Sequence, residues 1–159
     1  MKPKIIVFDR DGTLNYQPSD GDWVLDKNEL KIIPGTKRLL NKLVKAGYLL
    51  FIFTNQSCIG RGKTNLYSVL EVNRLLMDKL PIEDVFMCPH RAEDNCSCRK
   101  PKPGMLDEIK NKYDPDMSHS YVVGNTEIDE LAARATGFKS ILIETDKGIK
   151  AAVEEILKC

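Results

Sequence analysis

The chain has 159 residues, of which 42% are hydrophobic and 30% are charged. This length fits one domain of ordinary size, and the composition supports a folded core and excludes extensive disorder. The 24 Lys and Arg residues nearly balance the 23 Asp and Glu residues. That balance excludes the positive field on which general nucleic-acid or anionic-membrane binders depend. We expect a single domain over residues 1–159 that binds anionic ligands through local groups.

The sequence contains no apolar run near the roughly 18 residues of a membrane span, and no signal-peptide core precedes its first strand-like run. Three of its five cysteines, Cys88, Cys96 and Cys98, lie close together at metal-binding spacing, which is typical of a reducing compartment. We therefore predict a cytoplasmic monomer that has neither nucleic acid nor membrane as a partner.

Short apolar runs alternate with helical patterns along the chain. The expected strands are buried on both faces and span residues 5–8, 49–53, 85–87, 121–123 and 141–143. Helical periodicity is found near residues 39–44, 66–80, 104–112, 128–136 and 148–158. This alternation predicts a doubly wound, Rossmann-like α/β fold, in which helices cover both faces of a parallel sheet.

Four polar segments directly follow predicted strands. They are residues 9–13, residues 54–56, the Cys/His cluster that begins at Cys88, and residues 124–125. In open α/β sheets the ligand crevice lies at the carboxyl ends of the strands. We therefore expect the four segments to meet around one ligand site.

Asp9 and Asp11 can approach one substrate from different directions, because the chain leaves the first strand between them. A carboxylate can accept a phosphoryl group as an aspartyl-phosphate, which water then hydrolyses. We expect Asp9 to attack and Asp11 to transfer a proton, with Mg²⁺ bound beside these oxygens. An ordinary turn rich in Asp and Gly is the alternative that these residues alone leave open.

Cys88, His90, Cys96 and Cys98 supply four soft or borderline ligands. Such a closed tetrahedral set suits a structural Zn²⁺ and leaves no open position for catalysis. We expect the ion to fold residues 88–98 into a rigid clip that presents Arg99 and Lys100 to a phosphate. The alternatives are buried thiols near a histidine, or a zinc-binding nucleic-acid module, which would need a basic face.

The segment 9–13, Asp-Arg-Asp-Gly-Thr, resembles the first motif of the haloacid-dehalogenase-like phosphatases. The resemblance implies that Asp9 is the nucleophile and that Asp11 is the general acid and base, with its main-chain carbonyl as a Mg²⁺ ligand. It extends to Thr54, whose hydroxyl would bind the phosphoryl group, and to Lys100, the cation of the third motif. Both groups would stabilise charge that grows in the transition state.

The fourth motif of that family has an aspartate where this chain has Asn125. Asparagine keeps a carbonyl oxygen but loses the negative charge, so we expect Asn125 to bind Mg²⁺ more weakly. Asp129 is expected to hold Lys100 or the metal waters. For Glu127 we favour the role of a first-turn helix acid.

The combination of these motifs resembles the zinc-containing branch of D-glycero-D-manno-heptose 1,7-bisphosphate 7-phosphatases and histidinol-phosphatases. It implies a Mg²⁺-dependent phosphomonoesterase for a small sugar phosphate, with the cap reduced to loops. Residues 16–23 and the zinc loop would wall the substrate. The positions that the resemblance assigns to substrate binding are Asn55, Gln56, Ser57, Arg61 and Arg99.

Two features of the chain favour different substrates. The stretch Arg61-Gly62-Lys63 is similar to the heptose enzymes, whereas the five residues between His90 and Cys96 are similar to the histidinol type. Loops tolerate deletion more readily than pocket chemistry does, so we favour the heptose bisphosphate. Histidinol phosphate is the alternative substrate.

Two further classes of protein stay open. Residues 57–64 fall one glycine short of a phosphate-binding P-loop, which keeps a nucleotide-dependent phosphotransferase as an alternative. The change at Asn125 keeps a third class, an inactive zinc-stapled interaction protein.

Overall fold

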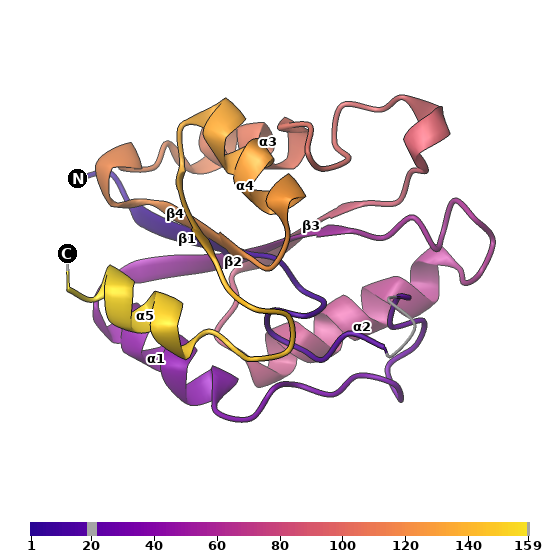
Figure 1. The fold of residues 1–159 in the computed structure, drawn as a ribbon, viewed down its shortest axis with the longest axis horizontal. Helices are drawn as coiled ribbons and strands as arrows, with labels where there is room; N and C mark the ends of the chain where they lie inside the picture. The colour runs from indigo at the N-terminus through magenta and orange to yellow at the C-terminus, as the bar shows by residue number, and fades with distance from the viewer. Residues whose placement is uncertain (19–21, 159) are drawn as a thin grey trace.

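The computed structural model describes residues 1–18 and 22–158 (Figure 1). Five strands form one parallel sheet in the order β3-β2-β1-β4-β5, which confirms the predicted doubly wound α/β fold. The strands are β1 (Lys4–Phe8), β2 (Tyr48–Asn55), β3 (Asp84–Cys88), β4 (Tyr121–Gly124) and β5 (Lys139–Leu142).

Helices cover both faces of the sheet (Figure 1). One face packs against α1 (Thr36–Lys45), α2 (Leu66–Lys79) and α5 (Lys150–Ile156), and the other against α3 (Gly104–Tyr113) and α4 (Glu127–Thr136). Two short 3₁₀ helices are η1 (Ala92–Asp94) and η2 (Met117–His119). In the part of the chain that the structure describes, no helix is long and apolar enough to cross a membrane.

Alternation along β1 explains why the sheet has a core on each side. Ile6 and Phe8 join the core under α1, α2 and α5, whereas Ile5 and Val7 join the core under α3 and α4. All four side chains are fully buried. A strand that is buried on both faces has a continuous run of apolar residues in its sequence, and residues 5–8 of β1 form such a run.

The expected burial of every strand on both faces is wrong for the two edge strands. In β3, Val85 and Met87 are partly exposed. In β5, all four residues are at least partly exposed, and Ile143 lies beyond its end. The position of β5 at the edge of the sheet explains the difference, because a neighbouring strand covers it on one side only. In the same sheet, β2, β1 and β4 are neighbours, so the polar segments that follow these three strands lie side by side.

Candidate active site and metal cluster

A pocket of about 160 Å³ lies at the carboxyl ends of β1, β2 and β4, where the sequence predicts the ligand site. The four predicted catalytic side chains all line it, together with two predicted binding residues. These six residues are Asp9, Asp11, Thr54, Asn55, Lys100 and Asn125. Segments that are far apart in the sequence thus meet at one site, but the Cys/His cluster, which was expected to meet them and to wall the substrate, does not line the pocket.

Lys100 is the buried cation of this pocket. Its Nζ donates to Asp9 Oδ1 and to Asp129 Oδ1, each at 2.7 Å, so the expected contact with Asp129 is present. Asp129 is held in turn at the start of α4, because its Oδ2 accepts from the amides of Asn125 at 3.2 Å and Thr126 at 3.1 Å. The helix terminus therefore fixes Lys100 beside Asp9.

The electrostatics of this group keep Asp9 and Lys100 in charged forms. Burial raises the pKa of Asp9 to about 6, because desolvation of the carboxylate outweighs the attraction of Lys100, and the charge of Asp129 adds to the rise. Burial disfavours the Lys100 ammonium, but the two carboxylates outweigh it and raise the pKa of Lys100. At neutral pH the pocket therefore holds the Asp9 carboxylate beside a cation, a pair of groups that can act on a phosphoryl group.

Asp11 accepts four hydrogen bonds. Its Oδ1 accepts from Arg10 Nε at 3.1 Å and from Asn15 Nδ2 at 2.9 Å. Its Oδ2 accepts from Arg10 Nη2 at 3.1 Å and from Gln56 Nε2 at 2.9 Å. Burial disfavours the charged carboxylate, but the Arg10 charge and these bonds outweigh burial and lower the pKa of Asp11. Asp11 is therefore ionised here, the form that can accept a proton from water.

Asn55, the last residue of β2, and Gln56, the next residue, contact Thr54 and Lys100, the two groups expected to bind phosphate. Gln56 Nε2 donates to Thr54 Oγ1 at 2.8 Å, so the Thr54 hydroxyl can donate its own hydrogen to a phosphoryl oxygen. The Asn55 side chain pairs with the main chain of Lys100, accepting from its amide at 3.0 Å and donating to its carbonyl at 3.2 Å. Asn55 thereby joins the end of β2 to the segment that carries Lys100.

The structure separates the residues expected to contact the sugar. Of the five, Asn55 lines the pocket, and the other four do not. Gln56 and Ser57 are fully buried, because the chain turns inward after β2, and Gln56 contacts Asp11 and Thr54 instead. Arg61 is exposed, and Arg99 is half-buried with Nη1 donating to the His90 carbonyl at 3.4 Å.

The segment 16–23 contributes to the pocket wall as expected, through Gln17, Asp22 and Trp23. Asp22 also accepts from Lys63 Nζ at 3.0 Å, which joins this wall to the loop after β2. Residues 19–21 of the segment lie outside the described residues. An exposed ion pair therefore lies at one edge of the pocket.

Sequence reasoning missed Arg10 and Asn15 as parts of the site. Both are fully buried, and both hold Asp11. A signal was present for Arg10, since an arginine between two motif aspartates directly after a buried strand has little access to solvent. Its second partner, Asn73, lies 63 positions away in the sequence, so the pattern alone does not identify that contact.

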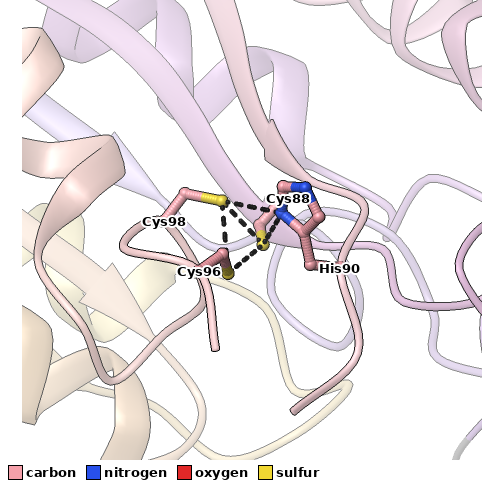
Figure 2. Close-up of side chains that lie close together, drawn as sticks. All are labelled: Cys88, His90, Cys96 and Cys98. Atoms are coloured by element: carbon pink, nitrogen blue, oxygen red, sulfur yellow. Dashed lines mark hydrogen bonds between the residues drawn. The ribbon is translucent and has the colours of Figure 1, made fainter. Parts of the chain in front are cut away.

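The cysteines and histidine of the predicted zinc clip do come together (Figure 2). We call Cys88, His90, Cys96 and Cys98 the zinc cluster. Its ligand atoms all lie within 4.8 Å of one another. All four cysteines that the structure describes, these three and Cys58, are free thiols.

Most distances within the zinc cluster lie near those of a tetrahedral site, and one pair of thiols lies closer together. Cys88 Sγ lies 3.5 Å from His90 Nδ1 and 3.6 Å from Cys96 Sγ. Cys98 Sγ lies 3.3 Å from His90 Nδ1, 3.6 Å from Cys96 Sγ and 2.9 Å from Cys88 Sγ. Zinc bonds of about 2.0–2.3 Å place tetrahedral ligands roughly 3.4–3.8 Å apart. The Cys88 and Cys98 sulfurs, at 2.9 Å, would have to move apart around an ion. Three thiols and one imidazole are ligand types that suit Zn²⁺.

Oxygen atoms that suit Mg²⁺ gather in the pocket itself, which the zinc cluster does not line. Asn125 Nδ2 donates to Thr145 Oγ1 at 2.9 Å, while Asn125 Oδ1 accepts a long 3.4 Å bond from Thr13 Oγ1. Gly12, at φ +82°, allows this approach, since a side chain there would collide with the Asn125 amide. The Asp9 carboxylate and the Asn125 oxygen line the same pocket and are hard ligands of the kind that Mg²⁺ prefers.

The P-loop alternative loses its structural basis. In the segment 57–64, the amide of Gly60 donates to the Pro89 carbonyl at 3.1 Å, and that of Lys63 donates to the Cys58 carbonyl at 2.9 Å. A P-loop needs such amides to face a phosphate. In this structure the amides of Gly60 and Lys63 donate to main-chain carbonyls instead.

The comparisons with known proteins agree with this site. Residues 4–141 match the family model described as polynucleotide kinase 3 phosphatase. The D-glycero-beta-D-manno-heptose-1,7-bisphosphate 7-phosphatase of Pseudomonas aeruginosa is 36% identical over 156 residues, which cover 94% of this chain and 86% of that protein. The enzyme of the same description from Neisseria meningitidis serogroup A is 36% identical over 152 residues, covering 92% of this chain and 80% of that protein.

A solved structure extends the likeness to three dimensions. It is the crystal structure of D,D-heptose 1.7-bisphosphate phosphatase from B. bronchiseptica, complexed with magnesium and phosphate. Its TM-score is 0.82 at 28% sequence identity, with 98% of each chain covered. The shared fold, and a site with Asp9 beside Lys100, define a haloacid-dehalogenase-like phosphatase, an enzyme that hydrolyses phosphomonoesters. Within that class, the chain belongs to the D-glycero-beta-D-manno-heptose-1,7-bisphosphate 7-phosphatase family.

Proposed function

We propose that this enzyme removes the 7-phosphate of D-glycero-D-manno-heptose 1,7-bisphosphate through an aspartyl-phosphate on Asp9. The observation that carries the proposal is the Asp9 carboxylate, which lines the pocket 2.7 Å from Lys100 in a chain of this family. The curated relatives named above support the heptose substrate over histidinol phosphate.

The proposed reaction has two steps. Asp11, which is ionised in the free protein, takes up a proton from solvent as the anionic substrate binds. Asp9 Oδ2 then attacks phosphorus, the bond from phosphorus to the sugar oxygen breaks, and Asp11 gives its proton to that oxygen. Water then attacks the aspartyl-phosphate, Asp11 accepts its proton, and Asp9 is regenerated with release of phosphate. Lys100 and the Thr54 hydroxyl bind the non-bridging oxygens, whose charge develops in each transition state.

Two metal ions complete the proposal. Asp9, the Asp11 main-chain carbonyl and Asn125 would hold Mg²⁺, which supplies positive charge to the phosphoryl group when bound. The zinc cluster would hold Zn²⁺ and keep residues 88–98 folded next to Arg99 and Lys100.

We also propose that the enzyme is a single-domain cytoplasmic monomer. A reducing compartment would keep the thiols of the zinc cluster available for the ion.

The test compares kcat/KM for heptose 1,7-bisphosphate and for histidinol phosphate in the presence of Mg²⁺. We expect the heptose bisphosphate to be preferred and Asp9→Asn to release no phosphate. Asp78→Asn, a matched change at an exposed aspartate of α2, should retain the rate. A preference for histidinol phosphate would reject the substrate, and turnover by Asp9→Asn would reject the nucleophile.

A further inference from the structure

We propose that Arg10 and Asn73 are positioning residues that aim the Asp11 carboxylate for proton transfer, an inference that rests on the proposed function. Arg10 is fully buried, although it follows the nucleophile Asp9 directly in the chain. Its guanidinium contacts Asp11 on one side and Asn73 on the other, since Nη1 donates to Asn73 Oδ1 at 2.8 Å. The chain of contacts therefore runs from α2 to the pocket.

The contact between Arg10 and Asp11 sets the orientation of the Asp11 carboxylate and also stabilises its negative charge. Nε and Nη2 each lie 3.1 Å from a different oxygen of Asp11. Such a two-point contact between two planar groups restrains the carboxylate in both position and plane, which a lysine ammonium does not do. Asp11 is thereby held at the pocket wall at a defined angle.

Stability does not account for this arrangement. A buried ion pair recovers little more than the cost of desolvating its charges, and apolar replacements of similar volume are often as stable. Arg10 has no exposed surface and does not line the pocket, so it does not reach the substrate directly. Orientation of Asp11 is the role that its contacts support.

Asn73, on helix α2, is the residue that holds Arg10 in place on the side away from Asp11. It is the one side-chain amide among the four buried residues of α2, which the structure describes in full; the others are Val69, Val72 and Leu76. A polar group on the apolar face of a helix is costly unless it is hydrogen-bonded, and Arg10 Nη1 provides the partner. Asn73 is 5% exposed and lies outside the pocket lining, so it acts through Arg10.

This role predicts an effect that depends on the leaving group. A 4-nitrophenolate departs without a proton, whereas a phenolate or a sugar alkoxide benefits increasingly from a general acid. The constant kcat/KM reports the steps up to departure of the leaving group. Misaligned Asp11 should therefore lower kcat/KM for heptose 1,7-bisphosphate most, for phenyl phosphate less, and for 4-nitrophenyl phosphate least.

The experiment measures kcat/KM for these three substrates with Asn73→Leu, which removes the acceptor for Arg10 at similar volume. We expect a loss of about tenfold or more for the heptose bisphosphate, below the full general-acid contribution, and about twofold or less for 4-nitrophenyl phosphate. Asn73→Asp keeps an acceptor oxygen and should restore the heptose rate. Asp11→Asn removes the general acid itself, so it should show the same order of losses in kcat/KM among the three substrates, with the largest differences between them.

A matched control separates positioning from packing. Leu76→Ala removes buried apolar volume from the same helix and should change kcat/KM for all three substrates by one common factor. Arg10→Lys keeps the charge but loses the two-point contact. Arg10→Lys should lower kcat/KM for the three substrates in the same order as Asn73→Leu does. It replaces Asn73→Leu in the experiment if that variant does not fold.

The outcomes distinguish this inference from the proposed function. Equal losses for all substrates, or failure of Asn73→Asp to restore the rate, would overturn the positioning role while leaving the phosphatase mechanism in place. If wild-type protein hydrolyses none of the three substrates, the proposed function fails and the inference fails with it.

Discussion

The Lys100 ammonium lies 2.7 Å from Asp129, and the two side chains are only 3% and 1% exposed. Asp129 also accepts from the amides of Asn125 and Thr126, which directly precede α4, so one carboxylate joins a helix terminus to the cation beside Asp9. Gly124 makes this possible, because a side chain at that position would overlap Asp129. The pair therefore couples the stability of the fold to the position of the cation beside Asp9.

Asp129→Asn should lower the free energy of unfolding by about 3 kcal/mol, because Lys100 loses one of its two buried partners. Urea unfolding monitored by circular dichroism measures the change. The control is Asp107→Asn, an exposed acid in the first turn of α3, which should stay within about 0.5 kcal/mol of wild type. Equal unfolding midpoints for Asp129→Asn and wild type would contradict the expected role of the pair.

Asn125→Asp should lower the Mg²⁺ concentration that gives half-maximal rate. The substitution adds a second carboxylate to a hard cation that binds through charge and oxygen geometry. The difference from wild type should shrink as Mg²⁺ saturates. Glu127→Gln, at an exposed residue outside the pocket lining, is the control. A midpoint that moves with Glu127→Gln and not with Asn125→Asp would place the missing metal ligand at Glu127.

Elemental analysis of protein purified without added metal should find about one Zn²⁺ per chain, as four ligands make one tetrahedral site. Cys96→Ser should lose the ion, unfold at lower temperature and lose activity, because residues 88–98 no longer hold Arg99 and Lys100. Cys58→Ser alters a buried thiol outside the zinc cluster and should retain the ion. Cluster thiols that react freely in folded wild-type protein would contradict the site.

Asp9→Asn should change how stability depends on pH in protein without added Mg²⁺. The pKa of Asp9 is raised from 3.8 to about 6, so its contribution to stability is present below pH 3.8 and is lost as pH rises towards 6. Asparagine does not titrate. The stability of Asp9→Asn relative to wild type should therefore increase over that interval, by at most about 3 kcal/mol, as measured by urea unfolding at each pH.

Asp116→Asn provides a control of opposite sign. Hydrogen bonds from Ser118 and His119 lower the pKa of Asp116 to about 2, so its contribution is present above pH 3.8 and is lost as pH falls towards 2. The stability of Asp116→Asn relative to wild type should decrease as pH rises from 2 to 4. A pH-independent difference for Asp9→Asn would show that the carboxyl is not perturbed by burial.

The sequence by itself determined the order of the strands and helices, and which residues form the zinc cluster. Both depend on short-range patterns: apolar runs of strand or helix period, and ligands spaced between Cys88 and Cys98. The placement of Asp9, Thr54 and Asn125 at one pocket also followed, because parallel strands end at the same edge of a sheet.

Only the tertiary structure decided which polar side chains face the pocket and which support it from within the protein. The turn after β2 directs Gln56 to Asp11 and Thr54, although its place in the motif suggested a sugar contact. The packing of α2 brings Asn73 to Arg10 across 63 positions of the sequence. Such contacts depend on the angles at which elements pack, and the local apolar pattern that defines an element does not encode those angles.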